Sequence, residues 1–295
     1  MSTHGGMGTE RAMDADVPLP RLNFLGCGHL GRALGRLLAE AGLVRLGAVL
    51  TRSPASAAAA VSFMGGGVPI SGMSEMGPAA LFMIATPDRE IGAACAALAD
   101  SGLLAPGTIV FHCSGALSSR ELQPARDRGA RVASLHPVRS FAVPEQVAID
   151  FAGTHCGIEG DAGAIEVLQP LFEAAGARVF AIATEHKILY HAAAVFASNY
   201  TVTLIDVALR AYAKAGVPER DALAMLAPLV SKAMENVFRV GPGRALAGPI
   251  ARGDIDAALR QQQAVAQWDA ETGELYRQLA RFTARLAGRP EEPFA

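Results

Sequence analysis

The chain has 295 residues and a mass of 30.6 kDa, which is enough for one large domain or two smaller ones with a sizeable core. Half of the residues are hydrophobic and 18% are charged, and the formal net charge of −2 argues against a nucleic-acid-binding protein, which would carry a basic patch. The four cysteines form no CxxC pair, so neither a disulfide framework nor a zinc site is expected.

The first twenty residues, MSTHGGMGTERAMDADVPLP, lack the apolar core of a signal peptide, and we expect them to form a flexible tail. No uninterrupted apolar run approaches the ~18 residues that a membrane span needs. The sequence therefore predicts a cytoplasmic protein that has no membrane partner.

The first predicted strand, residues 21–25, runs directly into the motif GCGHLG, and a helical pattern follows over residues 32–41. A GxGxxG motif between a strand and a helix is typical of dinucleotide binding, the alternative being an ordinary glycine turn. Gly26 would permit the tight turn, Gly28 would let the backbone approach a pyrophosphate, and Gly31 would let the helix pack on the strand. N–H groups at the helix start would hold the anion. The cofactor-binding residues predicted here are Gly26, Cys27, Gly28, His29, Leu30 and Gly31.

The second predicted strand, residues 46–50, ends where an NAD-binding chain usually places an acidic residue for the ribose. This chain has Thr51, Arg52 and Ser53 there instead. Arg52 can pair with a 2′-phosphate, and Ser53 can both cap the next helix and donate to that phosphate. These three residues predict NADP(H) rather than NAD as the cofactor, the alternative being a solvated arginine after a strand.

Further strands alternate with helices, and this alternation is typical of a parallel sheet. The helix after the strand that ends in His112-Cys113 is predicted to open with a capping box of Ser118 and Glu121. The later strands are predicted at 80–85, 108–113, 131–135, 155–159 and 178–182, the last two flanking a helix over 165–175. The fold expected for residues 21–184 is an α/β Rossmann-type domain.

Ligands of such domains gather at the carboxyl ends of the strands. Ala85, Thr86 and Pro87 follow one buried strand and are predicted to contact the cofactor. Ser114 and His136 follow two others and are predicted to bind the substrate. For His136, a loop residue before a proline is the alternative.

From residue 185 onward the strand patterns stop, which predicts an all-helical domain over 185–290. A long helix is expected over 186–214 and another over 218–240, with a kink at Pro228. A loop at 248–254 precedes further helices. A helical domain that follows a dinucleotide-binding one often supplies a wall for the substrate and a homodimer interface. The many apolar residues in this half predict helices that are buried on more than one side, either by another helix or by a second subunit.

The helix start KILYHAAAVFASNY carries one of only three lysines among 26 basic residues. At 100° per residue, Lys187, His191 and Ser198 share one line, and Asn199 lies about a quarter-turn from His191. We expect Lys187 to act in general acid–base catalysis, His191 to be its partner or substitute, and Asn199 to bind substrate. The alternatives are a snorkelling lysine and an interface histidine. The spacing of His186 and His191 does not suit a metal site.

The stretches FLGCGHLG, FHCSGALSS, SLHPVRSF, KILYHAAAVFASNY and LAGPIARGD carry a family resemblance over residues 21–281. Together they resemble a bacterial family that joins a Rossmann-like domain to a helical domain of unknown function, number 2520. This resemblance implies a fold and a cofactor, but it does not supply a reaction.

That family is in turn similar to the 6-phosphogluconate and 3-hydroxyacid dehydrogenases, and to ketopantoate and pyrroline-carboxylate reductases. In those enzymes a lysine and an asparagine four residues later often act on the substrate. This chain has Lys187 but places His191 at the second position, with Asn199 two turns further on. His136-Pro137 also resembles prephenate dehydrogenases, although the neighbouring glycine pattern is missing.

These patterns predict an NADP(H)-dependent oxidoreductase that transfers hydride to or from a small carbonyl, hydroxy acid or imine. One alternative is an NADP sensor or regulatory protein, which would need the glycine loop and Arg52 but not Lys187. Another is a prephenate-dehydrogenase-like enzyme, in which His136 would matter more than Lys187.

Overall fold

The computed structural model describes residues 18–295, so most of the tail expected over residues 1–20 lies outside the described part of the chain. The chain divides into two compact units, one ending at Ala193 and the other spanning Ala194–Ala295. The predicted division at 184/185 lies earlier, and helix α7 (Lys187–Ala197) crosses the observed one.

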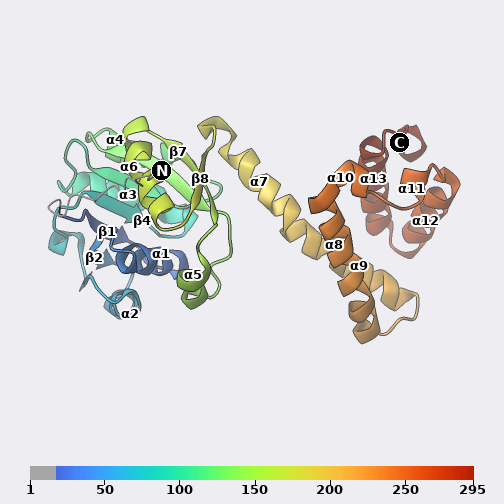
Figure 1. Cartoon of the computed structure of the whole chain (residues 1–295), viewed down its shortest axis with the longest axis horizontal. Helices are drawn as coiled ribbons and strands as arrows, with labels where there is room; N and C mark the ends of the chain where they lie inside the picture. The colour runs from blue at the N-terminus through green and yellow to red at the C-terminus, as the bar shows by residue number, and fades with distance from the viewer. Residues whose placement is uncertain (1–17) are drawn as a thin grey trace, which may run out of the picture. The chain divides into compact units, whose positions relative to one another are not determined.

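An eight-stranded sheet with helices on both faces forms the first unit (Figure 1). The strand order is β3-β2-β1-β4-β5-β6-β7-β8. The strands are β1 (Arg21–Leu25), β2 (Arg45–Leu50), β3 (Val68–Ile70), β4 (Leu81–Ile84), β5 (Ile109–His112), β6 (Arg131–Pro137), β7 (His155–Gly160) and β8 (Arg178–Ala181). The α-helices are α1 (His29–Glu40), α2 (Pro54–Met64), α3 (Ile91–Asp100), α4 (Gln123–Arg126), α5 (Pro144–Asp150) and α6 (Ala162–Ala174).

The expected α/β class is confirmed, but the sheet is not wholly parallel. Strands β1 to β6 run parallel to one another, whereas β7 pairs antiparallel with β6, His136 lying opposite Gly157. Helix α5, which follows β6, packs on α1. It does not return the chain to the amino end of β6 before β7 begins. A parallel neighbour would need such a crossover. The start of β7 therefore lies beside the carboxyl end of β6.

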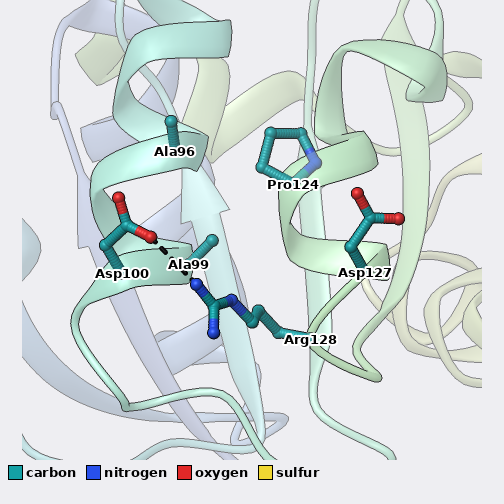
Figure 2. Close-up of a pocket in the computed structure, with 6 residues that line it drawn as sticks. All are labelled: Ala96, Ala99, Asp100, Pro124, Asp127 and Arg128. Atoms are coloured by element: carbon teal, nitrogen blue, oxygen red, sulfur yellow. Dashed lines mark hydrogen bonds and ion pairs between the residues drawn. The ribbon is translucent and has the colours of Figure 1, made fainter.

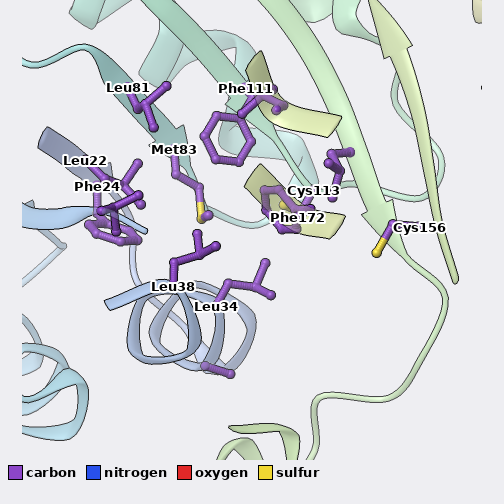
Figure 3. Close-up of a cluster of buried hydrophobic side chains, with 14 of the residues drawn as sticks. Leu22, Phe24, Leu34, Leu38, Leu81, Met83, Phe111, Cys113, Cys156 and Phe172 are labelled. Atoms are coloured by element: carbon purple, nitrogen blue, oxygen red, sulfur yellow. The ribbon is translucent and has the colours of Figure 1, made fainter. Parts of the chain in front are cut away.

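Side chains of the central strands alternate between two hydrophobic clusters, one on each face of the sheet. In β4, Leu81 and Met83 join one cluster, and Phe82 and Ile84 join the other. The first cluster packs against α1 and α6 through residues such as Leu34 (Figure 3). Because strands covered on both faces lack a polar side, they read in the sequence as continuous apolar runs.

The second unit is helical, as expected. Its helices are α8 (Asn199–Lys214), α9 (Glu219–Val240), α10 (Pro242–Ala245), α11 (Pro249–Arg252), α12 (Ile255–Trp268) and α13 (Ala270–Leu286). The helix expected over 186–214 is interrupted at Ser198, where ψ is −69° and φ is −115°, and the Ser198 hydroxyl donates to the Ala194 carbonyl at 2.8 Å. Pro228 lies inside α9 without ending it.

The stretch Thr184–Lys214, 31 residues long, is by length and composition apolar enough to cross a membrane. This differs from the expectation that no apolar run would approach that length. The difference arises because Lys187, His191 and Asp206 interrupt the run without making its average polar.

Candidate functional site

The glycine motif forms the turn between β1 and α1. Gly26 has φ +76°, and a Cβ built on it would lie 2.6 Å from the Thr86 nitrogen. A Cβ on Gly31 would lie 2.8 Å from the Ala85 Cβ, so this glycine lets α1 approach the end of β4. Gly28 differs from both, because a Cβ there would meet no atom within 4 Å. Gly26 and Gly31 are thus explained by the fold, whereas Gly28 leaves open space.

The open space at Gly28 lies at the amino end of α1. Gly28 is the N-cap of this 12-residue helix and supplies no side-chain cap. The first N–H groups of a helix have no partner within the helix, and the helix dipole favours an anion there. Nearby, Thr86 Oγ1 is buried and has no hydrogen-bond partner among the described residues. The loop therefore offers donors and room to a phosphate, which fits a dinucleotide.

The residues after β2 are arranged as the sequence predicts for a helix start. Ser53 caps α2, its Oγ accepting from the Ser56 nitrogen at 3.2 Å, and Pro54 is the first helical residue. The Thr51 hydroxyl donates to the Ser53 carbonyl at 2.8 Å. Arg52 is exposed and forms no ion pair among the described residues. Its guanidinium is free to meet an anion.

Cys27, His29 and Leu30 complete the motif, and the Cys27 side chain is not reactive. Burial raises the pKa of the Cys27 thiol to about 12, so the thiol stays protonated at neutral pH. His29 and Leu30 are the first residues of α1, and their predicted contribution to cofactor binding is through backbone N–H groups.

The loop after β5 is held by its own polar side chains. The Ser114 hydroxyl donates to Asp88 Oδ2 at 2.7 Å and accepts from the nitrogens of Ala116 and Leu117. Its predicted contact with substrate would compete with these three bonds. His112 accepts from the Ser114 nitrogen through Nδ1, which leaves the proton on Nε2 to donate to the Ser118 carbonyl at 3.1 Å. Burial lowers the pKa of His112 to about 4, so it is neutral.

A buried carboxylate, that of Glu159, fixes the far end of the same loop. The predicted capping box of Ser118 and Glu121 does not form, since Ser118 makes no side-chain cap and the element that follows is the short 3-10 helix η3 (Ser119–Leu122). Instead the buried Glu159 carboxylate on β7 accepts from the Ser119 nitrogen at 2.7 Å and from the Ser119 hydroxyl at 2.8 Å. Thr184 donates to the same carboxylate at 2.9 Å.

Four residues meet at the carboxyl ends of β5 and β6, and we call them the histidine cluster: Gly115, His136, Tyr190 and His191. His136 Nδ1 lies 3.0 Å from the Tyr190 hydroxyl, and the imidazoles of His136 and His191 stand edge to face with centroids 6.0 Å apart. A Cβ on Gly115 would lie 2.5 Å from His191 Nδ1 and 2.9 Å from His136 Nε2. Both rings therefore pack against the bare backbone of Gly115.

His191 Nδ1 is buried and has no hydrogen-bond partner among the described residues. An unpaired buried polar atom is costly, and it commonly marks a place where a ligand or a water binds. Its neighbour His136 is half-buried, and burial, followed by the charges of Lys187 and His191, lowers the pKa of His136 to about 4. His136 is therefore a neutral imidazole at physiological pH.

Lys187 lies beneath the cluster and is only 1% exposed. Its Nζ donates to the Ser134 hydroxyl at 2.8 Å and lies 5.9 Å from the centre of the Tyr190 ring. Burial lowers the pKa of Lys187, although the charge of Glu159 opposes this shift. The predicted direct proton transfer by Lys187 would need a substrate to reach a nitrogen that surrounding side chains enclose. Its charge, in contrast, already acts on His136.

The predicted site residues are brought together only in part. Lys187, His136 and His191 converge, and Ser114 lies next to Gly115 in sequence. Asn199 begins α8 in the second unit and is exposed, so its contact with substrate stays a prediction. Sequence reasoning did not single out Gly115, Tyr190, Ser134 or Glu159. Gly115 lies in the stretch HCSG and Tyr190 in the stretch LYH. No pattern in the sequence indicated that either residue contacts His136.

A cavity of about 390 Å³ lies elsewhere, between α3 and α4 (Figure 2). The Asp100–Arg128 ion pair, with an N–O distance of 3.1 Å, crosses it. Asp100 ends α3, and the chain then enters β5 at its amino end. This cavity therefore lies near the amino ends of the strands, whereas the glycine loop lies at their carboxyl ends. None of its lining residues belongs to the predicted site.

Two family models match the chain. Residues 8–137 match the Rossmann-like domain, and residues 154–283 match a domain of unknown function, DUF2520. Both matches agree with the resemblance inferred from the sequence stretches. No curated protein sequence matches the chain.

Several solved structures share the fold over nearly the whole chain. A protein from Thermotoga maritima is 26% identical, with a TM-score of 0.72, 90% of this chain and 98% of that one being covered. A proposed NADP oxidoreductase from Bacteroides fragilis is 20% identical, with a TM-score of 0.68 and the same coverage. An imine reductase from Myxococcus stipitatus in complex with NADP+ is 16% identical, with a TM-score of 0.60, covering 91% of this chain and 93% of that one.

Proposed function

Because the chain belongs to the family that joins a Rossmann-like domain to a DUF2520 domain, we propose that it is an NADP(H)-dependent oxidoreductase. Its substrate is a small carbonyl compound, hydroxy acid or imine. The observation that carries this proposal is the open amino end of α1 at Gly28, on the same edge of the sheet as the histidine cluster. The fold shared with reductases supports it.

The spacing of the two sites suits a dinucleotide. In sheets of this kind the cofactor lies where the strand order reverses, here between β1 and β4. Strand β6, which ends in the histidine cluster, is three strand spacings from β1, or about 14 Å. A dinucleotide whose pyrophosphate is held at Gly28 can therefore extend along the carboxyl ends toward the cluster.

When bound, the nicotinamide would supply or accept the hydride. The chain must then move a proton to or from the substrate's oxygen or nitrogen. His136 and His191 are the groups in reach of a substrate above Gly115, and His136 has a neutral imidazole at neutral pH. Lys187 supplies a buried positive charge beside them, which stabilises negative charge that develops during the transfer.

Preference for NADP over NAD rests on Arg52. Titration of the purified protein with NADPH and with NADH should show tighter binding of NADPH, and an Arg52→Ala variant should lose about tenfold or more of that preference, since a charged hydrogen bond is worth about 1.5–3 kcal/mol. Arg45→Ala is a matched control, because Arg45 is exposed at the opposite end of β2. If the protein binds neither NADPH nor NADH, the proposal that it is an oxidoreductase is wrong.

We also propose that the chain forms a homodimer through its helical unit. Apolar side chains buried in the second unit are few: Ala222, Leu226, Ile250, Ala258, Ala280, Ala284 and Phe294. Large ones are left exposed, among them Phe238 at 85% and Phe282 at 61%. Such a unit needs more buried apolar surface to be stable.

Sedimentation velocity should therefore give a mass of twice 30.6 kDa, and Phe238→Glu should shift the protein toward the monomer. Arg220→Glu, at an exposed position on the same helix, should leave the mass unchanged. A wild-type monomer at micromolar concentration would refute the dimer.

A further inference from the structure

The hydrogen bond between Tyr190 and His136 joins residues 54 positions apart in the chain. Tyr190 OH lies 3.0 Å from His136 Nδ1, and the rings stand edge to face with centroids 5.7 Å apart. Among the described residues, neither atom has another hydrogen-bond partner. In the described part of the chain, no other hydrogen bond influences which nitrogen of His136 carries a proton.

Both groups keep one proton at neutral pH. Burial raises the pKa of the Tyr190 phenol to about 12, so the hydroxyl is not ionised. His136 is a neutral imidazole, because burial and the charges of Lys187 and His191 outweigh the attraction of Asp88 for its charged form. A neutral imidazole has one donor nitrogen and one acceptor nitrogen.

Two arrangements of the protons are then possible. If His136 Nδ1 donated to the phenol oxygen, the phenol hydrogen would have no acceptor among the described residues. If the phenol donates to Nδ1, its hydrogen is satisfied and the imidazole proton resides on Nε2. In the second arrangement the donor without a partner is Nε2–H, which is not among the buried unpaired atoms of the described residues, so its proton is accessible to water or a ligand; an unpaired buried donor would be costly.

The free nitrogen of His136, Nε2, lies beside Gly115 in the histidine cluster. Nε2 lies 2.9 Å from the place that a Cβ on Gly115 would occupy, and the unpartnered His191 Nδ1 lies 2.5 Å from that same point. Only a glycine lets both imidazoles approach the backbone so closely. His136 Nε2 has no hydrogen-bond partner among the described residues and is not among their buried unpaired atoms, so a proton on it is accessible to a substrate beside Gly115.

We propose that Tyr190 is a positioning residue that holds His136 in the tautomer with its proton on Nε2, so that His136 presents a proton donor over Gly115. The inference rests on the proposed function for its use of this donor in reduction. There, a bound reduced nicotinamide would supply the hydride to the substrate carbon, and the carbonyl π electrons would move to oxygen. The oxygen takes the Nε2 proton while the N–H electron pair stays on the ring.

Tyr190 also prevents the ring from becoming an anion. As Nε2 gives up its proton, Nδ1 receives the proton of the phenol, so His136 ends neutral with its proton on the other nitrogen. The negative charge then rests on the phenolate, which lies beside the buried Lys187 ammonium, 5.9 Å from the ring centre. Solvent afterwards returns one proton, and the pair is restored.

The tautomer can be measured without substrate or cofactor. The full chain labelled with 15N at histidine should show, in long-range 1H–15N correlation spectra at pH 7.5, a protonated Nε2 and an unprotonated Nδ1 for His136. The signals are assigned by their loss in His136→Asn. In Tyr190→Phe, the resonances should shift toward a mixture of both tautomers, whereas Tyr212→Phe, a tyrosine of α8, should leave them unchanged.

A proton on Nδ1 in the wild type, or an unchanged tautomer in Tyr190→Phe, would overturn the inference whatever the activity. If instead the spectra agree but no carbonyl or imine is turned over with NADPH, the tautomer stands and the proposed function fails. With an active substrate, Tyr190→Phe should lower kcat by about 100-fold. The double variant with His136→Asn should be no slower than His136→Asn alone.

Discussion

Replacing Gly26 with alanine should remove NADPH binding and lower the apparent Tm by about 5–10 °C. The alanine would have to adopt φ +76° and place its Cβ 2.6 Å from the Thr86 nitrogen and 2.8 Å from the Ala85 carbonyl oxygen. Both neighbours are backbone atoms, so they cannot rotate away. Backbone strain of this kind costs about 1–3 kcal/mol, to which the steric overlap adds. Thermal unfolding followed by circular dichroism, together with a fluorescence titration, measures both effects.

Gly28→Ala is the matched variant, because its Cβ meets no protein atom within 4 Å. The fold should be as stable as the wild type, to within about 0.5 kcal/mol, while NADPH affinity falls at least about tenfold because the methyl group occupies the approach of the pyrophosphate. A Gly28→Ala protein that binds NADPH normally would show that no phosphate approaches this backbone. A Gly26→Ala protein with unchanged Tm would contradict the geometry of the turn.

Replacing Lys187 with methionine should leave NADPH affinity unchanged and lower turnover by about 100-fold or more. The reason is that a buried positive charge beside the reacting groups commonly contributes 10²–10³ in rate, or ~3–4 kcal/mol. Methionine has a similar length and no charge, so it fills the space under the cluster. Lys214→Met, at an exposed lysine of α8, is the control and should change neither quantity. Unchanged turnover in Lys187→Met would remove Lys187 from the mechanism.

The same variant should be at least as stable as the wild type near neutral pH. Burial makes the folded pKa of Lys187 lower than that of the unfolded chain, whose value is near 10.5. Between these two values the unfolded state binds the proton more tightly, so wild-type stability rises with pH through that window. Below the window the full cost of the buried charge is present. Lys187→Met should lack this rise, and a large loss of stability instead would assign Lys187 a structural role.

Local patterns in the sequence were sufficient to predict most elements of the first unit. The strand–glycine–helix motif and the Ser53 cap depend on neighbouring residues only, and both are present. Strand β3 was missed, because Val68–Ile70 is three residues long, contains a proline and is mostly exposed. Periodicity in a sequence reveals a buried face, and a strand with one buried residue shows almost no periodicity.

The sequence by itself determined which residues were unusual: a glycine loop followed by Arg52 without an acid, and a lysine and a histidine on an apolar helix. Only the tertiary structure decided their partners. The reversal at β7, the packing of both imidazoles on Gly115, and the Tyr190–His136 bond all join segments far apart in the chain. Periodicity shows that a side chain is buried, but its partner depends on strand order and direction, and these are set by the packing of the whole unit.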